Sequence, residues 1–223
     1  MLRRDPFVEG GYYHLYNRGV DKRKIFLDKE DYQRFVALLY LCNSHDNLNL
    51  VDYFREGKKL KDAFDEQLNK RIVAIGAYCL MPNHFHLLAT ELVDNGISTF
   101  MKKIATAYVM YFNRKNNRTG TLFEGRFKSQ HAESDEYLKY LYSYIHLNPA
   151  KLVDRGWAEH CIASPAITKK FVKEYPYSSY PDFLSAHRKE RTVLSREKFP
   201  DYFETATDVD EMITDWLTKD RPF

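Results

Sequence analysis

The 223-residue sequence contains little cysteine and no long apolar run. Its three cysteines, Cys42, Cys79 and Cys161, have no paired spacing, which argues against a cysteine-rich zinc site and favours a reducing compartment. No apolar segment approaches the roughly 18 residues of a membrane-spanning helix. The first residues contain no apolar core of a secretory signal peptide. We therefore expect a cytoplasmic protein without a membrane partner.

Other signatures are missing as well. The sequence has no glycine-rich Walker loop, so nothing in it points to nucleotide-driven chemistry. It also has no internal repeat and no low-complexity segment. Hydrophobic residues make up 44% of the chain, enough for a globular core. The length fits one domain with elaborations, or two small domains.

The net charge of +3 hides an uneven distribution. Residues 101–130 are strongly basic, and residues 199–223 are mostly acidic. Such asymmetry favours a polyanion partner, with a solvated helix face as the open alternative. The candidate nucleic-acid-binding residues are Lys102, Lys103, Arg114, Lys115, Arg118, Arg126 and Lys128, together with Arg18 near the N-terminus. We expect the acidic segment to dock on the core through an apolar helical stripe and to compete with DNA for the basic region, with a purely structural closing helix as the open alternative.

The most informative motif is a His-x-His pair where a turn passes into a strand. Side chains alternate across a strand, so His84 and His86 project from one face while Phe85 and Leu87 project from the other. Neutral imidazole is the commonest protein metal ligand, but two ligands do not fill a coordination shell. A further ligand must come from elsewhere, and His14 and His146 are open candidates. A purely structural histidine pair remains the alternative.

A tyrosine-rich helix is predicted after residue 134. One stripe consists of Leu138, Leu141, Tyr142 and Ile145, and a second consists of Tyr137, Tyr140, Tyr144 and Asn148. Because Asn148 precedes Pro149, it is expected at the C-terminal end of the helix, where the helix dipole favours a cation. Its carboxamide oxygen is a suitable hard ligand for Mg²⁺ or Mn²⁺. An amphipathic helix without a catalytic role is the alternative.

Hydrophobic periodicity predicts a β-α-β-β-α-β order followed by another helix. The strands are expected at 11–18, 71–80, 84–90 and 121–131, with helices starting at Asp28, spanning 97–112 and starting at Ser134. This order is typical of a ferredoxin-like α+β fold, a four-stranded antiparallel sheet with helices on one face. We place the core domain at 8–153, with a charged insertion at about 50–70. A helical C-terminal extension is expected at 154–223.

Several motifs together resemble a known family, the single-tyrosine HUH transposases of the insertion-sequence type, and within them the REP-associated tyrosine transposases. The motifs are Tyr13–Gly19, Ile25–Leu27, Met81–Leu87, Gly125–Lys128 and Tyr144–Pro149, with Tyr175–Tyr180 following. The resemblance extends from about Gly10 to Leu184. It implies that His84 and His86 are metal ligands, that Tyr144 is the nucleophile, and that Asn148 completes a site for Mg²⁺ or Mn²⁺.

The implied activity is cutting and rejoining of single-stranded or hairpin (palindromic repeat) DNA through a 5′-phosphotyrosine intermediate. A phenol with a pKa of about 10 is a poor nucleophile at neutral pH, so a nearby cation is needed. The resemblance further implies a monomer or homodimer acting on DNA in a bacterial cytoplasm, at the nucleoid.

Three alternatives remain at the level of sequence. A domesticated DNA-binding protein could keep this fold without cleaving, and a nicking assay would reveal it. A replication initiator or relaxase-like nickase could use the same residues, although no helicase segment is present. A zinc-dependent hydrolase would need a carboxylate or third histidine at a recognised spacing, and none accompanies the pair.

Overall fold

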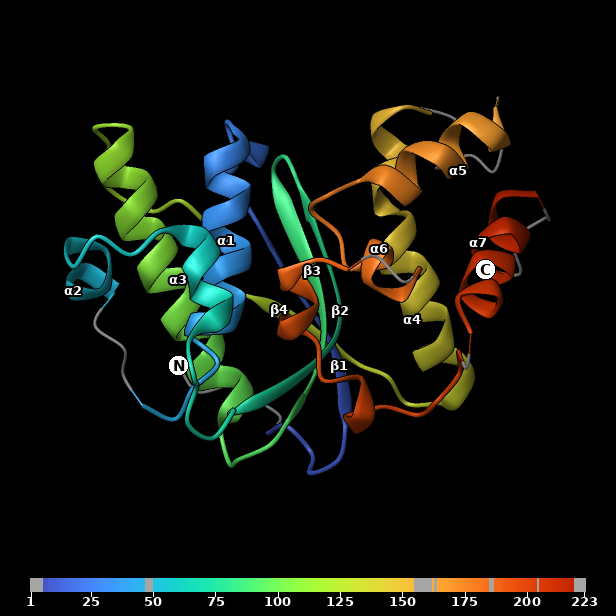
Figure 1. The fold of residues 1–223 in the computed structure, drawn as a ribbon, viewed down its shortest axis with the longest axis horizontal. Helices are drawn as coiled ribbons and strands as arrows, with labels where there is room; N and C mark the ends of the chain where they lie inside the picture. The colour runs from blue at the N-terminus through green and yellow to red at the C-terminus, as the bar shows by residue number, and fades with distance from the viewer. Residues whose placement is uncertain are drawn as a thin grey trace.

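The computed structural model describes residues 6–46, 50–154, 162, 164–184, 187–203 and 205–218. A four-stranded antiparallel sheet with the strand order β2-β3-β1-β4 forms its centre (Figure 1). In chain order, the elements of this core are β1 (Tyr12–Arg18), α1 (Lys29–Leu41), α2 (Leu50–Arg55), β2 (Val73–Met81), β3 (His84–Glu91), α3 (Gly96–Lys115), β4 (Lys128–His131) and α4 (Asp135–Leu147). The predicted ferredoxin-like α+β order is confirmed.

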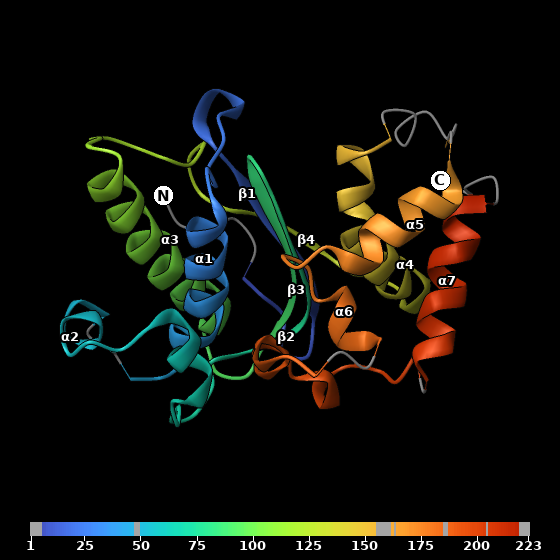
Figure 2. The ribbon, with the colours of Figure 1, turned by 45° about the horizontal axis from the view of Figure 1, so that its top comes forward.

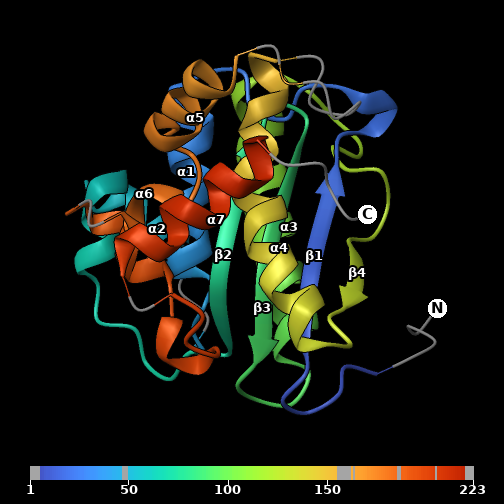
Figure 3. The ribbon, with the colours of Figure 1, turned by 90° about the vertical axis from the view of Figure 1, so that its right-hand side faces the viewer.

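Helices cover both faces of this sheet. The connecting helices α1 and α3 lie together on one face, as expected for the ferredoxin-like core (Figures 1 and 2). Helix α4 lies on the other face, where α5 (Pro165–Glu174), α6 (Tyr180–Phe183) and α7 (Ala206–Thr218) join it. The result is a three-layer arrangement, and Figure 3 views it from the side of α4. No helix among the described residues is long and apolar enough to cross a membrane.

The two predicted helix caps are present. The Asp28 carboxylate accepts a hydrogen bond from the Asp31 backbone N–H at the start of α1, and the Ser134 hydroxyl accepts one from the Tyr137 N–H at the start of α4. Such caps satisfy backbone donors that have no partner inside the helix. Ser134 therefore marks the start of α4.

The fourth strand is shorter than predicted. The sequence pattern predicts a strand at 121–131, but β4 contains only Lys128–His131. Gly125 has a φ of +78°, in the left-handed region that interrupts an extended chain. Before it, Leu122 and Phe123 are buried in a loop, and Phe123 makes only an isolated bridge to Gly19.

The C-terminal extension packs on α4 and α5 through its predicted apolar stripe. Val209, Ile213 and Leu217 of α7 are buried. Asp210 forms ion pairs with Lys169 and Lys173 of α5 rather than with the basic segment 101–130. The acids Glu204 and Asp220, like Cys161, lie outside the described residues. The boundary near residue 154 remains a prediction.

Candidate active site between the sheet and helix α4

The His-x-His pair projects from β3 toward α4, as alternation along the strand predicts. His86 is almost completely buried, with 5% of its surface exposed, and His84 is half-buried. Their ring centroids are 4.9 Å apart. Phe85, between them, projects from the opposite face and packs against Phe35 of α1, with ring centroids 4.9 Å apart. The strand therefore assigns the polar pair and the apolar residue to different layers.

Helix α4 places Tyr144 over this pair. The ring centroid of Tyr144 lies 5.6 Å from that of His86 and 5.7 Å from that of His14, both in edge-to-face geometry. Tyr144 is half-buried, and burial is the main reason that its pKa is raised above the usual value. The phenol is therefore protonated at neutral pH.

His14, from β1, is a hydrogen-bond partner of His86, and its role as a further metal ligand stays a prediction. Its Nε2 lies 2.8 Å from Nδ1 of His86, so one of these nitrogens carries the shared proton. His86 Nε2 is buried and has no hydrogen-bond partner among the described residues. His84 Nδ1 lies 2.7 Å from the Asn83 Oδ1 oxygen, to which it donates, leaving the His84 Nε2 lone pair available.

The arrangement of these nitrogens fits a divalent metal ion. Metal-bound histidines typically donate their second ring N–H to a neighbouring acceptor, as His84 does to Asn83. Burial lowers the pKa of His84 and of His14 to about 4, and burial also holds the pKa of His86 well below its usual value. The imidazoles are therefore neutral at pH 7, as coordination requires. No cluster of three or more His, Cys, Asp or Glu side chains suited to a metal exists within the described ranges.

Asn148 lies directly after α4 and is fully buried. Its Nδ2 donates a hydrogen bond of 2.8 Å to the Tyr144 carbonyl, and its Oδ1 accepts one of 2.9 Å from the Lys151 ammonium. The expected amide ligand is thus held at the end of the tyrosine helix, with its oxygen bonded to a lysine. Lys151 also lies 5.4 Å from the centre of the Tyr144 ring. Sequence reasoning missed this lysine, whose only signal was its position three residues after Asn148.

The second extra-ligand candidate, His146, lies elsewhere. It is fully buried, its Nε2 lies 2.8 Å from the Ser179 hydroxyl, and its ring packs against Tyr180 and Phe183 of the C-terminal extension. His146 is thus a structural histidine, and it does not join the His84–His86 pair.

The structure divides the predicted nucleic-acid-binding residues into two groups. Five of them, on or directly after α3, belong to the layer opposite Tyr144 (Figure 1). These are Lys102, Lys103, Arg114, Lys115 and Arg118. Lys103 donates to the carbonyls of Ser44 and Asp46, and Lys115 pairs with Asp28 and Asp31.

The remaining three lie at the β1–β4 side of the sheet. Arg18 is the cross-strand partner of His84, and Lys128 is the partner of Tyr16, so both side chains share the face of the site. Arg18 also pairs with Glu124. Arg126 is exposed in the loop before β4.

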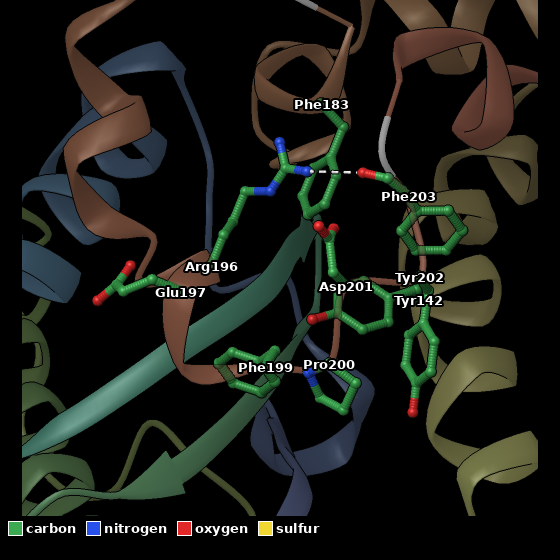
Figure 4. A pocket seen from close by; sticks show the side chains of 9 residues that line it. All are labelled: Tyr142, Phe183, Arg196, Glu197, Phe199, Pro200, Asp201, Tyr202 and Phe203. Atoms are coloured by element: carbon green, nitrogen blue, oxygen red, sulfur yellow. Dashed lines mark hydrogen bonds between the residues drawn. The ribbon is translucent and has the colours of Figure 1, made fainter.

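A separate cavity of about 370 Å³ lies on the other side of α4 (Figure 4). Its lining residues are Tyr142, Phe183, Arg196, Glu197, Phe199, Pro200, Asp201, Tyr202 and Phe203. Tyr142 points into it, whereas Tyr144, two residues later, is rotated by about 200° around the helix. The cavity therefore does not open onto the histidine pair.

Fold and site together define an α+β protein that brings a histidine pair on a sheet to a tyrosine on a covering helix. Residues 8–148 match the family described as "Transposase IS200 like", and the match spans more than half of the chain. The chain belongs to this IS200-like transposase family. The matched region contains His84, His86, Tyr144 and Asn148.

One solved structure with a similar arrangement is a REP-associated tyrosine transposase bound to a REP hairpin. It is 15% identical to this chain, with a TM-score of 0.49, and the alignment covers 90% of this chain and 88% of that one. No curated protein sequence matches the chain.

Proposed function

We propose that the protein cuts and rejoins single-stranded or hairpin DNA through a covalent bond to Tyr144, with Mg²⁺ or Mn²⁺ held by His84 and His86. The observation that carries the proposal is the convergence of two chemical groups. The buried His86 Nε2, which has no hydrogen-bond partner in the described part of the chain, and the Tyr144 ring lie on facing elements, with the His86 and Tyr144 ring centroids 5.6 Å apart. They belong to one matched transposase region.

The proposed reaction begins with in-line attack of the Tyr144 phenolate oxygen on a DNA phosphate. A bond forms between this oxygen and phosphorus, and the bond from phosphorus to the 3′ oxygen breaks. The products are a 5′-phosphotyrosine and a 3′ alkoxide, which takes up a proton to become the free 3′-hydroxyl. Because the phosphodiester energy is conserved in the covalent bond, attack by a 3′-hydroxyl reverses the reaction and joins strands without ATP.

Each neighbouring residue has a role in this proposal. When bound, the metal ion polarises the phosphate and stabilises the phenolate. Lys151 adds a positive charge 5.4 Å from the Tyr144 ring, which also favours the phenolate. His14 fixes the orientation of the His86 ring through their shared hydrogen bond. Asn148 anchors Tyr144 through its carbonyl, and its Oδ1 becomes a metal ligand if it exchanges Lys151 for the ion.

The proposed substrate follows from the access to Tyr144. A half-buried tyrosine between a sheet and a helix can reach a phosphate only in a strand that leaves the duplex stack. Arg18, Arg126 and Lys128, at the β1–β4 side, are suitably placed to track the backbone of such a strand. The resemblance to REP-associated transposases makes a palindromic hairpin with flanking single strand the first substrate to test.

The test uses the complete chain with a labelled pool of single-stranded DNA hairpins and Mn²⁺. The expected result is a protein–DNA adduct that survives denaturing electrophoresis and maps to the Tyr144 peptide by mass spectrometry. Binding of the pool without any adduct would contradict the cleavage proposal and favour the domesticated, non-cleaving alternative.

A further inference from the structure

Three tyrosines of α4 form a continuous row of rings that ends at Tyr144. The ring centroids of Tyr137 and Tyr140 are 5.5 Å apart with an interplanar angle of 18°, and those of Tyr140 and Tyr144 are 5.8 Å apart with an angle of 23°. All three rings are thus close to parallel. We call Tyr137, Tyr140 and Tyr144 the tyrosine ladder.

A fourth tyrosine, from β1, extends this surface across the sheet. Tyr16 stacks on His14 with ring centroids 4.9 Å apart, and its ring centroid lies 6.1 Å from that of His86. Tyr16 is also close enough to interact electrostatically with both ends of the ladder, Tyr137 and Tyr144. Aromatic rings therefore approach the nucleophile from two separate elements.

The ladder packs against the edge of the core and is not enclosed by it. The opposite stripe of α4, including Leu138 and Leu141, is buried, whereas Tyr137 and Tyr140 are only partly buried. By contrast, Tyr108 is fully buried and donates a hydrogen bond to the Ile25 carbonyl. Core packing explains a fully buried ring such as Tyr108. It does not explain why the ladder rings keep part of their surface accessible.

The C-terminal extension contacts the ladder at one ring. The Trp216 ring of α7 lies 5.1 Å from Tyr140, measured between centroids. Trp216 lies beyond the matched transposase region, so this contact belongs to the part of the chain outside the family match. A ring held in this contact loses little conformational freedom when a ligand binds to it.

Cations flank the aromatic surface. Lys128, the cross-strand partner of Tyr16, is exposed on the same face, and Lys151 lies beside Tyr144. Aromatic rings next to lysines suit single-stranded nucleic acid, because bases stack on the rings while phosphates contact the ammonium groups. Seven residues of helix rise about 10 Å, a span of two to three nucleotides.

We propose that the tyrosine ladder, together with Tyr16, is a stacking platform for unpaired nucleobases next to the phosphate that Tyr144 attacks. The platform rests on the proposed function, because it positions the strand for that nucleophile. It would explain how a strand is oriented at the site without reading each base, since every base has a face that can stack.

The test measures DNA binding in a Tyr144→Phe background, where cleavage is removed but the ring remains. The probe is single-stranded oligodeoxythymidylate, and a second probe carries 2-aminopurine or photoreactive 5-iododeoxyuridine. We expect Tyr137→Leu and Tyr16→Leu each to weaken binding about tenfold and to restore 2-aminopurine fluorescence. Tyr137→Phe and Tyr16→Phe keep the ring and should bind within about twofold of the background protein.

The matched control is Tyr177→Leu. Tyr177 is also partly buried and stacks on a tyrosine, Tyr32, at 3.9 Å, but its backbone bonds to β2, at the opposite edge of the sheet from β4. Its loss should leave binding unchanged. Circular dichroism of every variant confirms that it is folded.

The outcomes separate this proposal from the cleavage proposal. Photocrosslinks at Tyr137, Tyr140 or Tyr16 support the platform even if the parent protein forms no adduct with hairpins. Equal binding by the Leu and Phe variants, or crosslinks only on α3, would overturn the platform. An adduct at Tyr144 in that case would leave the cleavage proposal intact.

Discussion

The two faces of the central sheet differ in the side chains that the same strands present. The α1–α3 face carries apolar packing, and the α4 face carries the histidine pair. On the α1–α3 face, Phe85 packs against Phe35, which in turn contacts Tyr108 with ring centroids 5.0 Å apart. On the α4 face, the residues directly before and after Phe85 are His84 and His86. One face is closed and apolar, whereas the other holds polar groups beside a partly accessible tyrosine.

The difference shows how a single strand can combine stability with chemistry. Burying a polar group without a hydrogen bond costs free energy, so a core normally avoids it. On the α4 face, His86 Nε2 is buried without a hydrogen-bond partner among the described residues. Such a local cost is expected where function requires an open ligand position. The comparison can be tested by changing each face separately.

The largest effect is expected at the nucleophile. Tyr144→Phe removes one oxygen and keeps the ring, so it should abolish the covalent adduct while hairpin affinity changes by no more than a few-fold. Adduct formation on denaturing gels and binding by fluorescence anisotropy check the two parts. Covalent capture by the Phe variant would assign the role to another tyrosine, and Tyr140→Phe, on the same stripe, is the control that should keep capture.

The next largest effect concerns the metal. His86→Ala, His84→Ala, or a chelator added to the parent protein should each eliminate cleavage, and Mg²⁺ or Mn²⁺ should restore only the chelated parent. Asn148→Ala should be milder, because an amide is a weaker ligand and water can replace it. Calorimetric titration with Mn²⁺ measures the loss of binding directly. Unchanged cleavage in excess chelator would disprove the metal assignment.

A smaller effect is expected at His14, which forms a hydrogen bond with the proposed metal ligand His86. His14→Phe removes the hydrogen bond to His86 Nδ1, and such partners typically contribute about 10- to 100-fold to metal affinity or activity. His14→Gln retains an acceptor for the His86 Nδ1–H and should recover part of the loss. If both variants bind Mn²⁺ with the affinity of the parent protein, the hydrogen bond between His14 and His86 does not contribute to metal binding.

On the α1–α3 face of the sheet, a substitution should change stability rather than cleavage. Phe85→Ala removes a buried ring and should lower the free energy of unfolding by about 3–5 kcal/mol. Chemical denaturation measures this change. The fraction that stays folded should form the adduct at nearly the parental rate, and a strong loss of rate per folded molecule would show that the two faces are coupled.

The smallest effect is expected on the outer surface of α3. Lys102→Ala and Arg114→Ala should leave hairpin affinity within about twofold, because α3 lies in the layer opposite Tyr144. Arg126→Ala and Lys128→Ala, at the β1–β4 side, should weaken binding. Each should also reduce the slope of log affinity against log salt by about one, because one DNA phosphate is then no longer neutralised by the protein. Equal losses of affinity in both groups would show that DNA also binds to the α3 layer.

Local patterns in the sequence were enough for much of this site. Alternation along a strand placed His84 and His86 on one face of the sheet. Helical spacing placed Tyr144 and Asn148 on one stripe of the helix and Leu138 on a different stripe. The caps at Asp28 and Ser134 were also predictable, because each depends on residues three positions apart. Regular backbone geometry fixes all of these relations within one element.

The tertiary structure determined which residues of different strands and helices contact one another. The bond from His14 to His86 depends on the β1–β3 register, and the separation of the basic residues depends on which face α3 covers. The short β4 follows from the left-handed backbone at Gly125, and Lys151 reaches Asn148 only after the chain turns beyond α4. The sequence by itself determined the chemical groups and their direction on each strand or helix, because these follow from local periodicity. Only the packing of the layers decided which groups meet, because contacts between distant segments depend on strand pairing and helix placement that no local pattern encodes.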